Sequence, residues 1–156
     1  MQHWHHVVVD LDDDQLTSLA SLVKQQEMTV SAVASPIGKV DVSLDAELEV
    51  GRLRRIIRVA HALETPNIRV FSFFRGDGIP VEDIRDDVMF RMRLLADEAE
   101  NERVTLLHEN EKAIYGDIPE RVLDLVETVG SPALRLAWDN ANFVQVGVRP
   151  FTDGYA

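Results

Sequence analysis

The sequence contains no cysteine, which excludes disulfides, thiolate nucleophiles, zinc–thiolate sites and iron–sulfur clusters. Basic residues are also scarce, because 16 lysines and arginines stand against 27 aspartates and glutamates, giving a formal charge of -11. Such an excess of acid repels a phosphate backbone and an anionic lipid surface. We therefore expect neither a nucleic acid nor a membrane as a partner.

Long apolar runs are missing as well. None is long enough to span a bilayer, and the first six residues lack the charged and apolar regions of a signal peptide. What is present, 46% hydrophobic and 28% charged residues in a chain of 156, is typical of a globular protein of one domain. The sequence predicts a single domain over residues 1–156, located in the cytoplasm.

Candidate helices and strands alternate along the chain. Amphipathic segments predict helices over 12–27, 43–63, from 80 onwards and 117–130; short apolar segments predict strands over 29–34, 68–74, 103–108 and 133–138. We also expect a strand stub at 7–9 and at most one short helix in the tail, 140–156. Repeated strand–helix units predict an α/β fold with four to five parallel strands and flanking helices.

Local signals set several helix ends. Asp12 with Gln15, and Asp117 with Glu120, have the spacing of a capping box, and Gly130 is expected to end the fourth helix. The second helix carries several arginines that we interpret as partners of acids one turn away, not as a nucleic-acid patch. The residues concerned are Arg52, Arg54, Arg55 and Arg58, with Glu47 and Glu49.

Two acidic residues follow consecutive predicted strands. Functional groups of parallel α/β folds gather at the carboxyl ends of strands. Glu109 and Asp139 stand at such ends, 30 residues apart, which is one strand–helix unit. Side-chain alternation puts them on the faces of Leu107 and Ala137, so we expect them to be neighbours across roughly 5 Å of sheet. Two carboxylates so placed can share one hard divalent cation.

The spacing equally supports a structural interpretation, in which the two acids cap helices or pair with Lys112. By the same alternation His108 faces the helix layer, so we interpret it as a structural histidine. Lys39 and Arg75 follow strand ends and are either anchors for an anionic substrate group or solvated loop charges.

Four strand-end strings carry a resemblance to a known family. They are residues 31–39 (SAVASPIGK), 68–74 (IRVFSFF), 106–112 (LLHENEK) with 115–117, and 138–143 (WDNANF). In this order they resemble sugar phosphate isomerases/epimerases of the xylose isomerase-like TIM-barrel superfamily, which also contains endonuclease IV. The resemblance implies a partial (β/α)8 TIM barrel that spans the family's second or third to sixth strands.

The resemblance also implies roles for particular residues. Glu109 matches the family's metal-binding glutamate, which doubles as an acid/base, and Asp139 matches its metal-binding aspartate. Asn142 falls near the substrate, and Lys39 is a candidate partner for substrate oxygens. A divalent metal (Mn, Mg or Co) is expected to be weakly held, because the family's other two ligands come from strands that this chain does not match.

A full barrel of this type needs about 250 residues. A half-barrel leaves two unpaired sheet edges and one uncovered face, so we expect a homo-oligomer. The implied reaction is metal-assisted proton transfer next to the carbonyl of a small sugar or sugar phosphate. The alternative is a catalytically incomplete fragment or subunit that acts only through self-association or a partner. Phosphodiester cleavage at damaged DNA is argued against by the net charge of -11.

Overall fold

The computed structural model describes residues 10–154, so the strand stub expected at 7–9 lies outside the described residues. Four parallel strands form one sheet in the order β1-β2-β3-β4. The strands are β1 (Val33–Ala34), β2 (Asn67–Val70), β3 (Thr105–Glu109) and β4 (Leu134–Ala137). Spatial order equals chain order, because each crossover returns the chain beside the strand it has just left.

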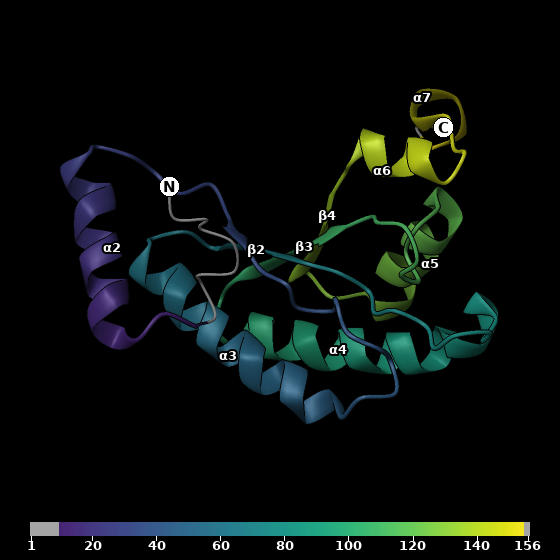
Figure 1. Cartoon of the computed structure of the whole chain (residues 1–156), viewed down its shortest axis with the longest axis horizontal. Helices are drawn as coiled ribbons and strands as arrows, with labels where there is room; N and C mark the ends of the chain where they lie inside the picture. The colour runs from purple at the N-terminus through teal and green to yellow at the C-terminus, as the bar shows by residue number, and fades with distance from the viewer. Residues whose placement is uncertain (1–9, 155–156) are drawn as a thin grey trace.

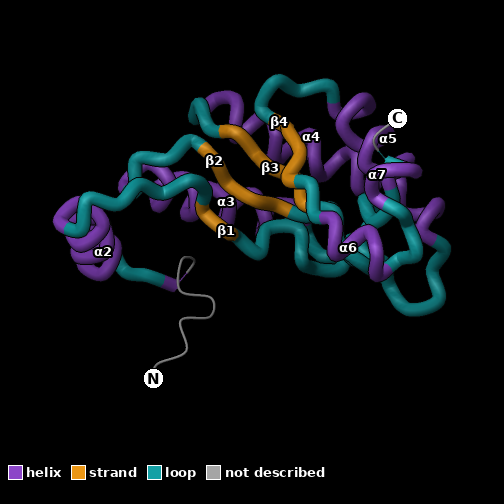
Figure 2. Tube along the Cα trace, turned by 90° about the horizontal axis from the view of Figure 1, so that it is seen from above, coloured by secondary structure: helices purple, strands orange, loops and turns teal. Residues whose placement is uncertain are grey.

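Helices connect the strands and gather mainly on one face of the sheet, as Figure 1 and Figure 2 show together. In Figure 2 the strands stand in front of α3 and α4, and no helix crosses in front of β2 or β3. The helices are α2 (Asp13–Gln25), α3 (Ala46–Ala62), the 3-10 turn η1 (Val81–Ile84), α4 (Arg85–Asn101), α5 (Pro119–Val129), α6 (Asn140–Gln145) and α7 (Pro150–Asp153).

The hydrophobic core lies between the sheet and these helices. Alternate strand residues point into it, and Ile68, Val70, Leu106 and Leu134 are fully buried. They pack in one cluster with apolar side chains of the two long helices. From α3 these are Leu53, Ile56, Ile57 and Ala60, and from α4 Val88, Met92, Leu95 and Ala99. Helical spacing of about 3.6 residues explains why these positions share one face.

The opposite face of the sheet is more open, and we call it the inner face. Along β2 and β3 half-buried residues alternate with buried ones. The half-buried set includes Arg69, Leu107 and Glu109, and in β4 Arg135 is exposed. The expected uncovered face is thus confirmed for the described residues.

Helix ends agree with the sequence where the signal is local. Asp12 and Gln15 form the predicted capping box at the start of α2, and Gly130 ends α5 with a left-handed φ of 64°. The capping box predicted at Asp117 is wrong, because α5 begins at Pro119 and no side chain caps it. The Asp117 carboxylate is instead paired with Arg121, one turn along the helix.

Other boundaries also differ from the prediction. Only Val33–Ala34 of the strand expected over 29–34 pairs with β2, and the tail contains two short helices where at most one was expected. Three of the four arginines of α3, Arg52, Arg54 and Arg55, pair with acids, and of these Arg52 alone does so one turn away, with Glu49. No helix within residues 10–154 combines the length and the apolar character needed to cross a membrane.

Candidate functional site at the strand ends

Glu109 is the last residue of β3 and lies half-buried on the inner face. Its carboxylate accepts hydrogen bonds from two sides. Arg69 of β2 donates from Nη1 to Oε2 at 3.2 Å, and Asn142 of α6 donates from Nδ2 to Oε1 at 3.5 Å. Glu109 is therefore held between the neighbouring strand and the helix that follows β4.

Asp139 follows β4. The sequence predicts that it lies beside Glu109 across the sheet, but the register offsets the two residues. The register pairs Glu109 with Ala137, so Asp139 stands two residues beyond that pair. Its Oδ1 accepts from the backbone N–H of Asn142 at 2.9 Å and thereby caps α6. The capping interpretation of Asp139 is confirmed, and its carboxylate still reaches the same asparagine that contacts Glu109.

Asn110 joins the two strand ends. This buried side chain accepts from the Asp139 N–H at 2.8 Å and donates to the Asp139 carbonyl at 2.9 Å. The Asn110 carbonyl accepts from Nδ2 of Asn142 at 2.9 Å. Because these bonds are made to the backbone, they fix where Asp139 and α6 stand relative to β3. Sequence reasoning missed Asn110, because its burial, which requires hydrogen-bond partners for the amide, is visible only in the structure.

Arg69 is the second residue that sequence reasoning missed. It lies in the middle of β2, and its Nη2 donates to the Ser35 carbonyl at 3.3 Å while Nη1 reaches Glu109. The guanidinium thus spans the inner face from the end of β1 to the end of β3. The signal was available, since Arg69 is the one charged residue in the apolar string 68–74.

Lys39 lies at the same end of the sheet, and its Nζ pairs with Glu111 at 2.6 Å. The same Nζ is 4.2 Å from the centroid of the buried Phe71 ring, and the Arg69 guanidinium carbon is 4.8 Å from that centroid. Lys39 and Arg69 therefore belong to one local cluster with Glu109 and Glu111.

His108 faces the other way, into the core, as the alternation predicted. Its Nε2 lies 2.9 Å from Oγ of Ser72, which also accepts from the N–H of Gly116 at 2.8 Å. Burial lowers the pKa of His108 to about 4. The ring is therefore neutral at pH 7 and belongs to the packing between β3 and the segment before α5.

Glu109 and Asp139 offer two carboxylates to a metal ion. Within residues 10–154 no three histidine, aspartate or glutamate side chains gather around one point. Glu109 and Asp139 nevertheless both contact Asn142. Mg²⁺ and similar hard cations are commonly held by one or two carboxylates and keep several waters. Two carboxylates beside one asparagine are of the donor type that a hydrated hard cation takes, and within residues 10–154 they do not form a closed cage.

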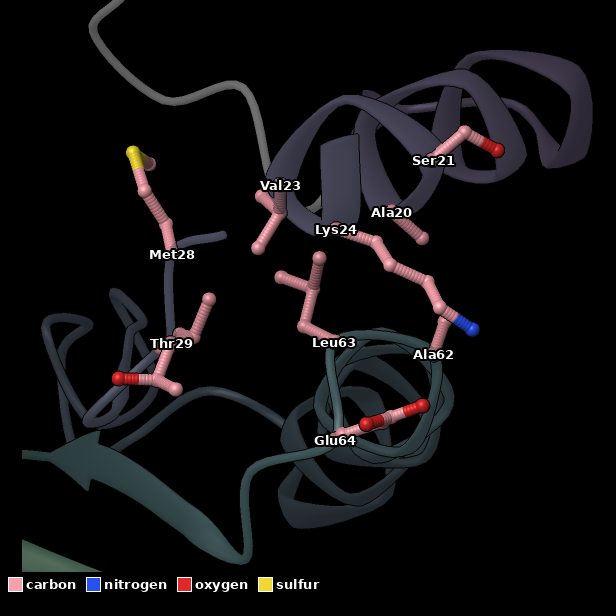
Figure 3. A pocket seen from close by; sticks show the side chains of 10 residues that line it. Ala20, Ser21, Val23, Lys24, Met28, Thr29, Ala62, Leu63 and Glu64 are labelled. Carbon is pink, nitrogen blue, oxygen red and sulfur yellow. The ribbon is translucent and has the colours of Figure 1, made fainter. Parts of the chain in front are cut away.

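A separate cavity of about 290 Å³ lies between α2 and the C-terminal end of α3 (Figure 3). Its lining is mostly small or apolar and includes Ala20, Val23, Met28 and Leu63. In Figure 1 α2 lies at the opposite end of the molecule from α6, so this cavity is distinct from the strand-end cluster.

The parallel sheet, its helix-covered outer face and the acids at its strand ends define part of a β/α barrel. The chain belongs to the Xylose isomerase-like TIM barrel family, whose model matches residues 1–153. The family resemblance of the sequence and the half-barrel fold are thereby confirmed. A search of curated proteins found no match to the chain.

Solved structures match the fold at low sequence identity. The probable 3-DHS dehydratase AsbF from Bacillus anthracis matches with a TM-score of 0.74 at 17% identity, over 88% of this chain and 50% of its own. A D-tagatose 3-epimerase-like protein matches with a TM-score of 0.74 at 20% identity, over 84% of this chain and 52% of its own.

A third matching structure is a Xylose isomerase-like TIM barrel protein from Mycobacterium smegmatis in complex with magnesium. Its TM-score is 0.71 at 16% identity, over 87% of this chain and 49% of its own. The chain thus spans about half the length of the solved structures it matches. At these identities the matches establish the architecture alone. The bound magnesium is a property of the Mycobacterium smegmatis protein.

Proposed function

We propose that this chain supplies the acidic half of a metal-assisted site for isomerisation or epimerisation of a small sugar or sugar phosphate. The observation that carries the proposal is that Glu109 and Asp139, from consecutive strand ends, both hydrogen-bond to Asn142. Family membership and the likeness to an epimerase-like protein support the same reaction class.

In this proposal Glu109 accepts the proton from the carbon next to the substrate carbonyl and returns it on the product side. Asn142, which already contacts Glu109, orients that carboxylate and is a hydrogen-bond partner for a substrate hydroxyl. Asp139 holds α6 in place through its cap and offers a second carboxylate. Glu109 and Asp139 would hold a divalent cation (Mn²⁺, Mg²⁺ or Co²⁺), which would supply Lewis-acid polarisation of a substrate oxygen. Two carboxylates alone bind it weakly.

The direct test is conversion of a ketose and of its phosphate with Mn²⁺ present. We expect slow conversion by the chain and loss of that conversion in Glu109→Gln, which keeps the shape of the side chain but cannot accept the proton. Activity no greater than that of Glu109→Gln contradicts catalysis by this chain.

A second candidate is a catalytically incomplete subunit that acts through self-association or a partner. The ion pair of Glu109 with Arg69 favours it, because the guanidinium supplies the charge that a metal would otherwise provide. The open inner face and the sheet edges at β1 and β4 favour a homo-oligomer.

Two measurements separate the candidates. If Mn²⁺ binds the native chain only, it raises the midpoint of thermal unfolding, and above Kd the midpoint keeps rising with the logarithm of the Mn²⁺ concentration; a flat titration supports the incomplete subunit. Sedimentation at micromolar concentration is expected to show an oligomer, and a monodisperse monomer contradicts self-association.

A further inference from the structure

Two cationic side chains lie against one buried aromatic ring at the strand ends, and each of them pairs with a carboxylate. Phe71 is fully buried, yet the Lys39 ammonium and the Arg69 guanidinium lie 4.2 Å and 4.8 Å from its centroid. Each cation has its own carboxylate partner, Glu111 at 2.6 Å for Lys39 and Glu109 at 3.2 Å for Arg69. The cluster holds two cations on a common apolar support, and the ring limits their hydration on one side.

Both cations are accessible to a ligand. The exposed fractions of the side chains are 35% for Lys39 and 31% for Arg69. The Arg69 guanidinium has five N–H donors, and within residues 10–154 two of its bonds are made, to Glu109 and to Ser35. Its Nε is buried without a hydrogen-bond partner among those residues, so the group is not saturated by the protein.

The bonds that Arg69 makes are long for a charge-assisted pair. Its contacts to Glu109 and Ser35 measure 3.2 Å and 3.3 Å, whereas bonds of this kind commonly measure about 2.7–2.9 Å. The bidentate pair between Arg54 and Glu98 on the outer helices has both contacts at 2.9 Å. Arg69 therefore has a loosely held partner, and its side chain is partly exposed on the inner face.

We propose that Lys39 and Arg69 form a binding subsite for an oxyanion, a phosphate or carboxylate group carried by the substrate. Bound there, the anion replaces Glu109 as the partner of Arg69 and releases the Glu109 carboxylate. The released carboxylate is the group to which the proposed function assigns proton transfer, so this inference rests on that proposal for its catalytic meaning. The anion-binding step itself needs neither metal nor turnover.

The probes are inorganic phosphate and acetate, titrated separately into the full chain at constant ionic strength held with chloride. Binding is followed by calorimetry and by the NMR signals of the arginine side chains. We expect saturable phosphate binding that weakens about tenfold in Lys39→Met and in Arg69→Met, since each removes one charge-assisted contact. Stronger binding of phosphate assigns a phosphorylated substrate, and stronger binding of acetate assigns a carboxylate substrate.

Two further variants sharpen the result. Arg135→Met removes an exposed inner-face arginine of β4 whose hydrogen bonds within residues 10–154 go to backbone carbonyls, so it is the matched control and should bind phosphate as the parent does. Glu109→Gln removes the competing charge, and we expect it to bind phosphate more tightly than the parent. Lys39 is on the surface, so Lys39→Met keeps the test valid if Arg69→Met does not fold.

The proposal is overturned if neither anion binds saturably, if the Arg135→Met control loses as much affinity as Lys39→Met, or if Glu109→Gln weakens binding. Failure of the proposed reaction gives a different pattern, in which no sugar is converted although phosphate binding and its tightening in Glu109→Gln are present.

Discussion

The two faces of β3 differ in every respect that matters for function. On the outer face Leu106 and His108 are buried at 0% and 1% exposure, Leu106 in the hydrophobic core and His108 against Ser72 and Gly116. On the inner face Leu107 and Glu109, their immediate neighbours in sequence, are half-buried and stand among charged side chains. The alternation of a strand thus separates a dry core from an accessible polar cluster within five residues.

The outer face of the sheet therefore stabilises the fold, and the inner face carries the groups available for chemistry. The outer face contributes apolar burial, which scales with the area removed from water. The inner face contributes groups held by long hydrogen bonds, such as the 3.2 Å contact of Arg69 with Glu109. Groups held in this way can exchange partners without loss of the core.

Truncating one leucine on each face of β3 should give the largest difference in stability. Leu106→Ala should lower the free energy of unfolding by about 3 kcal/mol, because it leaves a cavity in a fully buried position. Leu107→Ala should cost less than about 1 kcal/mol, since the inner face is open. Urea unfolding of both variants measures the difference. Equal losses in the free energy of unfolding would show that Leu107 is as tightly packed as Leu106, and that the inner face is covered.

A glycine substitution tests how tightly the outer face is packed around His108. A Cβ at Gly116 would lie 2.5 Å from the His108 ring and 3.0 Å from Oγ of Ser72, so Gly116→Ala should cost about 2 kcal/mol. Gly51→Ala in α3 is the matched control, because nothing lies within 4 Å of that Cβ. The control should gain about 0.5–1 kcal/mol from higher helix propensity. Thermal unfolding gives both values, and a stable Gly116→Ala would contradict the close packing.

An ion pair between outer helices offers a comparison with Arg69 and Glu109. Arg85 of α4 donates to both oxygens of Asp124 in α5, at 2.8 Å and 2.5 Å. This pairing, with a further bond from Tyr115, lowers the pKa of Asp124 from 3.8 to about 2. A depressed pKa stabilises the fold above pH 3.8, and the contribution is lost as pH falls through about 2.

We therefore expect Asp124→Asn to cost about 1 kcal/mol at pH 6, a value reduced for solvent screening because the side chain is partly exposed. The difference from the parent should shrink when unfolding is measured at pH 3. A cost that is constant between pH 6 and pH 3 would assign the effect to shape and not to charge.

The smallest effect separates the two interpretations of Asp139. Asp139→Ala removes the cap of α6 and should cost about 0.5–1 kcal/mol, whereas Asp139→Ser keeps a capping oxygen and should cost less. If Asp139 is also a metal ligand, both variants lose the Mn²⁺-dependent rise in the thermal midpoint. Retention of that rise in Asp139→Ser would leave capping as the role of this carboxylate.

Local patterns predicted the parts of the fold that depend on few residues. The capping box of Asp12 and Gln15 and the helix end at Gly130 were predictable, because each is decided by groups within a few positions. The signal at Asp117 failed since Arg121, one turn along the helix, pairs with the same carboxylate. Competing partners of this kind are invisible to spacing alone.

The strand-end cluster was predictable only in part. The alternation of residues correctly put Glu109 on the inner face and His108 in the core, because the period of a strand is two. The partner of Glu109 in the sheet register is Ala137, and the role of Arg69 arises from the neighbouring strand. The register and this contact depend on the geometry of the helical connections between strands, which the sequence of one strand does not determine.

The amino-acid sequence is enough to predict an α/β chain without thiol chemistry, its alternation of helices and strands, and which acids follow the strands. These properties follow from composition and from periods of two and 3.6 residues. Only the tertiary structure decided that Asn110 clamps two strand ends, that Asn142 contacts both acids, and that Lys39 and Arg69 share the ring of Phe71. These groups meet because parallel strands bring residues some 30 to 40 positions apart to one edge, and hydrogen bonds and charge then select their partners.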